Sequence, residues 1–174
     1  MRVDGELEQA GDRWRLRFAR RLGHPPERVW RALTEPADLA AWFPTTIEGD
    51  RQPGAKLRFS FPNGEAPPLD GEMITCRPPS VLEYLWGEDT LRFELHPDGA
   101  GTLLILLDTF DEQGKAARDA AGWHVCLDRL AGRLDGVPAP ADPASGWQAA
   151  NAGYVERFGP RAATIGPPES FTRT

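Results

Sequence analysis

The chain has 174 residues, of which 40% are hydrophobic and 26% are charged, a balance typical of one soluble globular domain. Its formal net charge is −6, and no basic stripe is interleaved with aromatic residues, so the sequence predicts no nucleic-acid partner. The two cysteines, Cys76 and Cys126, are too few for a disulfide scaffold and lack metal-ligand spacing.

The N-terminal region has no apolar run of the kind found in a signal peptide. Residues 1–12 are polar and acidic, and we expect them to form a flexible segment. The longest purely apolar run, residues 103–107, is far too short to span a bilayer. We therefore expect a cytoplasmic protein without membrane insertion.

The first expected elements are one strand and two short helices. Residues 13–18 alternate arginine with large apolar side chains, which predicts a half-buried strand. A helix can begin at Pro25-Pro26, because proline suits the first helical turn, and it must end before Pro36. A second short helix follows and stops at Pro44.

The pattern then changes to period two, and we expect about six strands between residue 56 and residue 110. Short connections rich in proline and glycine predict hairpins, and hence an antiparallel meander. Residues 103–110 are apolar on both faces apart from Asp108 and Thr109, so this strand should lie centrally in the sheet or be covered on both sides.

The last long element should be a helix from near Gly114 to about Leu134, because its large apolar residues recur at three and four positions. Residues 138–146 indicate a linker, residues 147–158 a short terminal helix, and the tail after Gly159 a loose end. The expected division is therefore a flexible segment 1–12, an α+β domain 13–136, and an appendage 137–174.

Four segments of the chain resemble one known family. They are residues 26–34 with the following Pro36, Leu39, Trp42 and Phe43; Pro78-Pro79 before 82–86; Gly101-Thr102 leading to Phe110; and Gly122-Trp123 with Leu127-Asp128 and Leu130. The family is the bacterial branch of the activator-of-heat-shock-chaperone-ATPase homologues, within the START-like (SRPBCC) superfamily. The resemblance implies a helix-grip fold, in which a curved antiparallel sheet wraps around the long C-terminal helix and leaves a deep cavity. Superfamily members bind lipids, sterols, hormones and polyketides, and a few catalyse cyclisation or hydrolysis.

Twelve side chains are expected as candidates to line that cavity, although ordinary core packing is the favoured explanation for most of the aromatic ones. They are Trp30, Trp42, Phe43, Phe59, Phe61, Met73, Tyr84, Trp86, Phe93, Asp108, Trp123 and His124. Asp108 shares the inward parity of Leu104 and Leu106, and His124 follows Trp123 on the long helix. These two residues would form a polar clamp for a ligand; in the favoured alternative, Asp108 satisfies backbone groups and His124 is solvated.

The function expected from the sequence is non-catalytic binding of a small hydrophobic or amphipathic molecule between the sheet and the long helix. Two alternatives stay open, a protein-interaction or co-chaperone-like accessory, and a cyclase or hydrolase that uses Asp108 and His124. The sequence has no glycine-rich phosphate loop, nucleophile elbow or zinc-ligand pair, so we expect no cofactor and no metal. A homodimer is compatible with this sequence.

Overall fold

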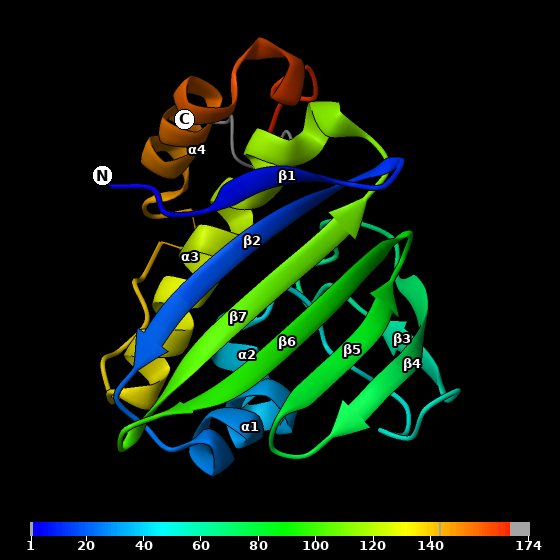
Figure 1. Ribbon diagram of the computed structural model, residues 1–174, viewed down its shortest axis with the longest axis vertical. Helices are drawn as coiled ribbons and strands as arrows, with labels where there is room; N and C mark the ends of the chain where they lie inside the picture. The colour runs from blue at the N-terminus through cyan, green and yellow to red at the C-terminus, as the bar shows by residue number, and fades with distance from the viewer. Residues whose placement is uncertain (1, 143, 168–174) are drawn as a thin grey trace.

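The computed structural model describes residues 2–142 and 144–167, and its strands form one antiparallel sheet of seven in the order β1-β2-β7-β6-β5-β4-β3 (Figure 1). The strands are β1 (Glu6–Ala10), β2 (Arg13–Leu22), β3 (Lys56–Phe59), β4 (Leu69–Arg77), β5 (Val81–Trp86), β6 (Asp89–Asp98) and β7 (Gly101–Phe110). The helices are α1 (Pro26–Thr34), α2 (Pro36–Trp42), α3 (Ala116–Leu134) and α4 (Trp147–Phe158), with short 3-10 turns at Gln113–Lys115 and Pro160–Ala162.

The alternation of β2 and the apolar character of β7 explain the middle of the sheet. β2 pairs with β7 so that Leu16 lies opposite Asp108 and Phe18 opposite Leu106, and all four side chains are fully buried. β7 has β2 on one side and β6 on the other, which confirms its expected central position.

One face of the sheet carries the helices. Figure 1 shows α1, α2 and α3 behind the strands, and α4 packs against α3 near the N-terminal strand. The inner face of α3 begins with small residues, Ala117, Ala120 and Ala121, which are at most 1% exposed. Because these side chains are short, the helix backbone can approach the sheet closely. The expected α+β helix-grip fold is therefore confirmed.

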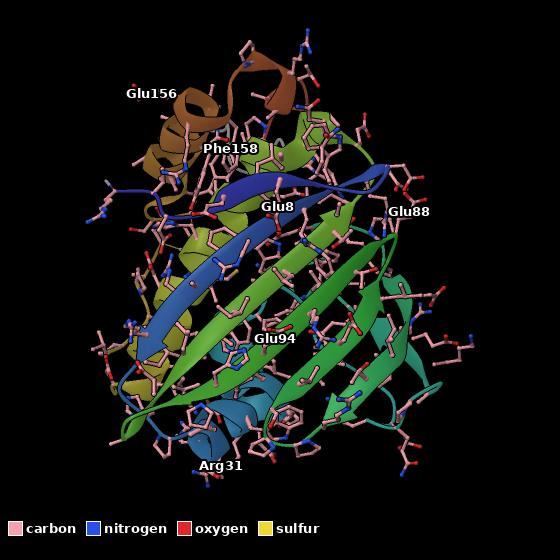
Figure 2. The ribbon with its side chains drawn as sticks, in the orientation of Figure 1. Glu8, Arg31, Glu88, Glu94, Glu156 and Phe158 are labelled. Carbon is pink, nitrogen blue, oxygen red and sulfur yellow. The ribbon has the colours of Figure 1, made fainter. Side chains whose placement is uncertain are left out.

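The opposite face of the sheet is covered by charged pairs. Glu94 lies on this outer face (Figure 2), where it accepts a hydrogen bond from Arg92 at 2.7 Å. Glu8 on β1 lies on the same face and pairs with Arg15 at 2.8 Å. Period-two alternation separates polar and apolar faces in the strands beside β7, whereas β7 itself places Leu103, Ile105 and Leu107 among these charged side chains.

Two expectations about the chain ends were wrong for the described residues. Residues 6–10, expected to be flexible, form β1, and the Gly5 N–H donates a hydrogen bond to the Tyr154 hydroxyl at 3.0 Å. β1 therefore precedes β2. Five strands follow the two short helices, where about six were expected.

The tail after Gly159 packs on the domain, because Ala162 is fully buried and the Ile165 N–H donates to the Gly114 carbonyl. The rest of the tail, residues 168–174, lies outside the described residues.

No helix within residues 2–142 and 144–167 has the length and apolar character needed to cross a bilayer.

Candidate functional site

A cleft of about 460 Å³ opens beside the N-terminal half of α3. Its walls come from the end of α2 with the following Phe43 and Pro44, from residues 61–65 after β3, from Trp86 at the end of β5, and from α3. The α3 residues in the wall are Arg118, Asp119, Gly122, Trp123, Val125, Cys126 and Arg129, and Trp147 contributes from the start of α4. The site therefore forms where four separate segments meet at one side of the helix.

Aromatic rings form a continuous wall of this cleft. The Trp123 ring lies 5.8 Å from Phe43 and 5.6 Å from Trp86, between ring centroids. Phe61 extends the patch, with its centroid 6.4 Å from that of Trp86. Tilted contacts of this kind hold aromatic rings in fixed relative positions and present a broad apolar surface.

The indole N–H groups of this wall are already engaged by the protein. Trp123 Nε1 donates to Asp108 Oδ2 at 2.9 Å, and Trp86 Nε1 donates to Thr45 Oγ1 at 3.3 Å. The two tryptophans consequently offer ring surface to a guest. Polar contacts would come instead from side chains on the rim, among them Arg118 and Arg129.

A buried acidic cluster lies behind Trp123. One carboxyl oxygen from each of Asp89, Asp108 and Asp119 lies within 4.8 Å of the others, and Lys115 Nζ is 2.6 Å from Asp89 Oδ1. Burial and then the neighbouring charges of Asp89 and Asp119 raise the pKa of Asp108 well above its ordinary value. Burial also raises the pKa of Asp119, against the opposing effect of Arg118 and Lys115.

Cys126 is the sulfur group in the cleft wall, and it is poorly suited to nucleophilic chemistry. Burial raises the pKa of its thiol to about 12, although the nearby charge of Arg129 acts in the opposite direction. The reactive form of cysteine is the thiolate, so this residue is an inert thiol at neutral pH.

The family model for Activator of Hsp90 ATPase homolog 1-like proteins matches residues 23–135, which include α1 to α3 and all strands from β3 to β7. The chain belongs to this family. A search of the curated proteins found no match.

Solved structures similar to this family member share its fold over most of their length. EF2215 from Enterococcus faecalis, described as a conserved protein of unknown function, is 21% identical with a TM-score of 0.72, covering 88% of this chain and 90% of its own. CalU16 from Micromonospora echinospora is also 21% identical, with a TM-score of 0.68 and coverage of 90% and 98%. The BPP1335 protein from Bordetella parapertussis is 29% identical, with a TM-score of 0.65 and coverage of 90% and 93%. These comparisons support the START-like architecture of this chain.

Five of the twelve side chains expected to line a cavity lie in the wall of the cleft. They are Trp42, Phe43, Phe61, Trp86 and Trp123. These five residues lie at or near the ends of α2, β3 and β5 and on α3, and the cleft opens where these elements meet.

The other seven expected residues do not line this cleft. They are Trp30, Phe59, Met73, Tyr84, Phe93, Asp108 and His124. Phe59, Tyr84 and Phe93 are at most 1% exposed and pack ring against ring, with centroids 5.5 and 6.3 Å apart. This part of the space between sheet and helix is therefore filled by side chains, and the cleft lies at its side.

The expected clamp between Asp108 and His124 does not form. Asp108 pairs with Trp123, whereas His124 Nδ1 lies 2.9 Å from the Tyr154 hydroxyl and 3.4 Å from Asp4 Oδ1. Neighbouring residues of a helix point in different directions, so Trp123 faces the acidic cluster and His124 faces α4. The alternative was also wrong, because Asp108 accepts its hydrogen bond from a side chain and His124 is buried.

Sequence reasoning missed the remaining α3 residues of the wall, particularly Gly122, Cys126 and Arg129. A signal was present, since Arg118, Gly122, Cys126 and Arg129 recur at three and four residues and therefore share one helix face. This face carries no large apolar side chain, so a search for apolar stripes passed over it.

Proposed function

We propose that this protein binds a small hydrophobic or amphipathic molecule in the cleft beside α3, without catalysing a reaction on it. The observation that carries the proposal is the aromatic wall of Phe43, Phe61, Trp86 and Trp123 around an open space of about 460 Å³. Ligand pockets of this size, lined by aromatic rings and a few polar groups, are typical sites for small organic molecules.

The floor of the cleft supports this proposal because it leaves space where most helices carry a side chain. A Cβ atom added to Gly122 would meet no atom within 4 Å. Gly122 lies between Trp123 and the polar pair of Arg118 and Asp119, which are joined by a 2.9 Å ion pair. A guest could therefore place apolar surface on the indole ring and a polar end near the arginine side chains.

The cyclase or hydrolase alternative relied on Asp108 and His124, and neither residue lines the cleft. The Cys126 thiol is neutral, and Asp108 lies behind the Trp123 ring and outside the cleft wall. Acid–base catalysis needs a titratable group within hydrogen-bond reach of the substrate, and Asp108 does not meet this requirement.

The test uses two substitutions at Gly122 and the fluorescent amphipath 8-anilinonaphthalene-1-sulfonate. We expect the wild-type protein to bind the dye saturably, with quenching of tryptophan fluorescence. Gly122→Leu should abolish this binding by filling the floor of the cleft, whereas Gly122→Ala should retain most of it. Both substitutions remove a helical glycine, so both proteins should fold at least as stably as wild type.

Absence of saturable dye binding by the folded wild-type protein, or equal binding by Gly122→Leu, would contradict the proposal. The protein-interaction hypothesis, which the family description motivates, would then be tested by stimulation of a bacterial chaperone ATPase.

A further inference from the structure

The acidic cluster behind Trp123 contains a buried oxygen that lacks a hydrogen-bond donor. Asp108 is fully buried, and its Oδ2 accepts the hydrogen bond from Trp123 Nε1. Its Oδ1 has no hydrogen-bond partner among the described residues. A buried carboxylate oxygen without a donor is costly, so this atom requires an explanation.

Apart from the Trp123 indole, Asp108 has two acidic side chains and two apolar strand residues among its neighbours. Asp89 approaches from β6, and Asp119 approaches from α3. The strand residues opposite Asp108 are Leu16 on β2 and Leu91 on β6, and both are fully buried. Lys115 is the cation of the cluster, but its Nζ is bound to Asp89 Oδ1 at 2.6 Å and lies 3.5 Å from Asp119 Oδ2.

We infer that Asp108 is a neutral carboxylic acid whose Oδ1–H donates to Asp89, and that this shared proton makes Asp108 the positioning residue for Trp123. One proton then satisfies both oxygens of Asp108, since Oδ1 becomes a donor while Oδ2 remains the acceptor for the indole. The direction of the pKa of Asp108, raised by burial and by Asp89 and Asp119, is the one that this arrangement requires.

Charge balance also favours a proton over a bound metal ion. With Asp108 neutral, the negative Asp89 and Asp119 are matched by Lys115 and by Arg118, which pairs with Asp119 at 2.9 Å. A divalent ion on these carboxylates would lie close to the Lys115 ammonium, which already pairs with Asp89 and Asp119, and the two cations would repel each other. The cluster is therefore complete with a single added proton.

The consequence for the cleft rests on the proposed function. Trp123 is the ring that contacts both Phe43 and Trp86, so fixing its indole also fixes the aromatic wall. The inference itself concerns the protein without ligand, and it is tested without one, so its failure and the failure of the binding proposal are separate results.

The experiment compares wild type with Asp108→Asn and Asp108→Ala in the full chain. An asparagine amide can donate to Asp89 and accept from Trp123, as a neutral acid does. We expect carbon-13 NMR at pH 7 to show the Asp108 carboxyl at the chemical shift of a protonated acid. The indole N–H resonance of Trp123 should stay near its wild-type position in Asp108→Asn and move in Asp108→Ala.

Urea unfolding provides a second readout with a defined sign. As pH rises above the ordinary carboxyl pKa of about 3.9, Asp108 ionises in the unfolded chain but stays protonated in the folded one. Wild type should therefore lose stability relative to Asp108→Asn between about pH 4 and pH 7. Asp50→Asn, in an exposed loop, is the control and should show no such trend.

The inference is overturned if the Asp108 carboxyl has the chemical shift of a carboxylate at pH 7. It is also overturned if wild type gains stability over Asp108→Asn as pH rises, which is the behaviour of a folded-state carboxylate held by Lys115. A Trp123 resonance that is unchanged in a folded Asp108→Ala protein would remove the positioning role.

Discussion

The Tyr154 hydroxyl joins three distant parts of the chain through two buried hydrogen bonds. It accepts from the Gly5 N–H at 3.0 Å and lies 2.9 Å from His124 Nδ1, so it connects the N-terminal strand, α3 and α4. Removal of this hydroxyl is costly, because the buried Gly5 N–H would lose its acceptor and His124 Nδ1 would lose its nearest hydrogen-bond partner.

We predict that Tyr154→Phe lowers the free energy of unfolding by about 1–3 kcal/mol. The substitution keeps the aromatic ring, but the buried groups that contact the hydroxyl lose this hydrogen bond. Urea unfolding measures the change, and amide hydrogen exchange at Gly5 should accelerate. Glu156→Gln on the exposed surface of α4 is the matched control and should leave both measurements unchanged. Equal stability of Tyr154→Phe and wild type would show that water replaces the hydroxyl.

Asp38 provides a second test at this scale, because it connects three helices. It accepts hydrogen bonds from Arg133 Nε at 2.8 Å and Arg28 Nη1 at 3.1 Å. Burial opposes its charge, but the hydrogen bonds from Arg133 and Arg28 outweigh this effect and lower its pKa. Asp38→Asn should cost about 1 kcal/mol at neutral pH, since both arginine side chains are partly exposed.

The pH dependence of Asp38→Asn distinguishes charge from shape. A lowered pKa means that the contribution of Asp38 is present above the ordinary carboxyl pKa of about 3.9 and is lost as pH falls through the lowered value. The stability gap between wild type and Asp38→Asn, measured by urea unfolding, should therefore narrow below about pH 4. A gap that persists unchanged at low pH would assign the effect to packing.

At the scale of single elements, glycines in β4 and α3 should respond to the same substitution in opposite ways. A Cβ at Gly71 would lie 1.9 Å from the Leu85 carbonyl oxygen and 2.6 Å from the Phe59 ring, whereas a Cβ at Gly122 meets open space. Gly71→Ala should destabilise the protein by about 1–3 kcal/mol through overpacking of the β4–β5 pair. Gly122→Ala should be neutral or stabilising by up to about 1 kcal/mol, because alanine favours helix. Urea unfolding measures the change in the free energy of unfolding for each variant. A destabilised Gly122→Ala would show that the cleft floor is closed in solution.

The success of sequence-based prediction also varied by element. Strong alternation in residues 13–18 and helical spacing from Trp123 to Leu134 predicted β2 and α3, because each element buries one clear apolar face. β1 has the sequence ELEQA and buries little, so its pairing with β2 left no such pattern. β1 is held by the local turn at Gly11, with φ +67°, and by the long-range hydrogen bond between Gly5 and Tyr154.

At the scale of the whole molecule, the site depended on information that periodicity does not contain. The resemblance predicted a cavity between sheet and helix, but the sizes of Phe59, Tyr84 and Phe93 decide whether that space is filled. The cleft beside α3 is bounded by residues 61–65 and by Trp147, and the spacing of apolar residues within α3 does not predict where these segments pack. Aromatic composition therefore identified part of the wall, while the position of the cleft required the packed structure.

The terminal helix tests whether residues 13–136 can fold as a unit without the appendage. α4 begins at Trp147, beyond the matched family region, yet Ala150 and Tyr154 are fully buried and Trp147 lines the cleft. Truncation after residue 136 should lower the free energy of unfolding by at least about 3 kcal/mol, because it exposes the surface of α3 on which these side chains pack. Urea unfolding followed by circular dichroism measures the loss, and amide exchange in β1 should accelerate with it, since Gly5 loses Tyr154. If the truncated chain instead unfolds at the same urea concentration with unchanged β1 protection, α4 adds nothing to the fold, and its contribution is confined to the wall that Trp147 provides.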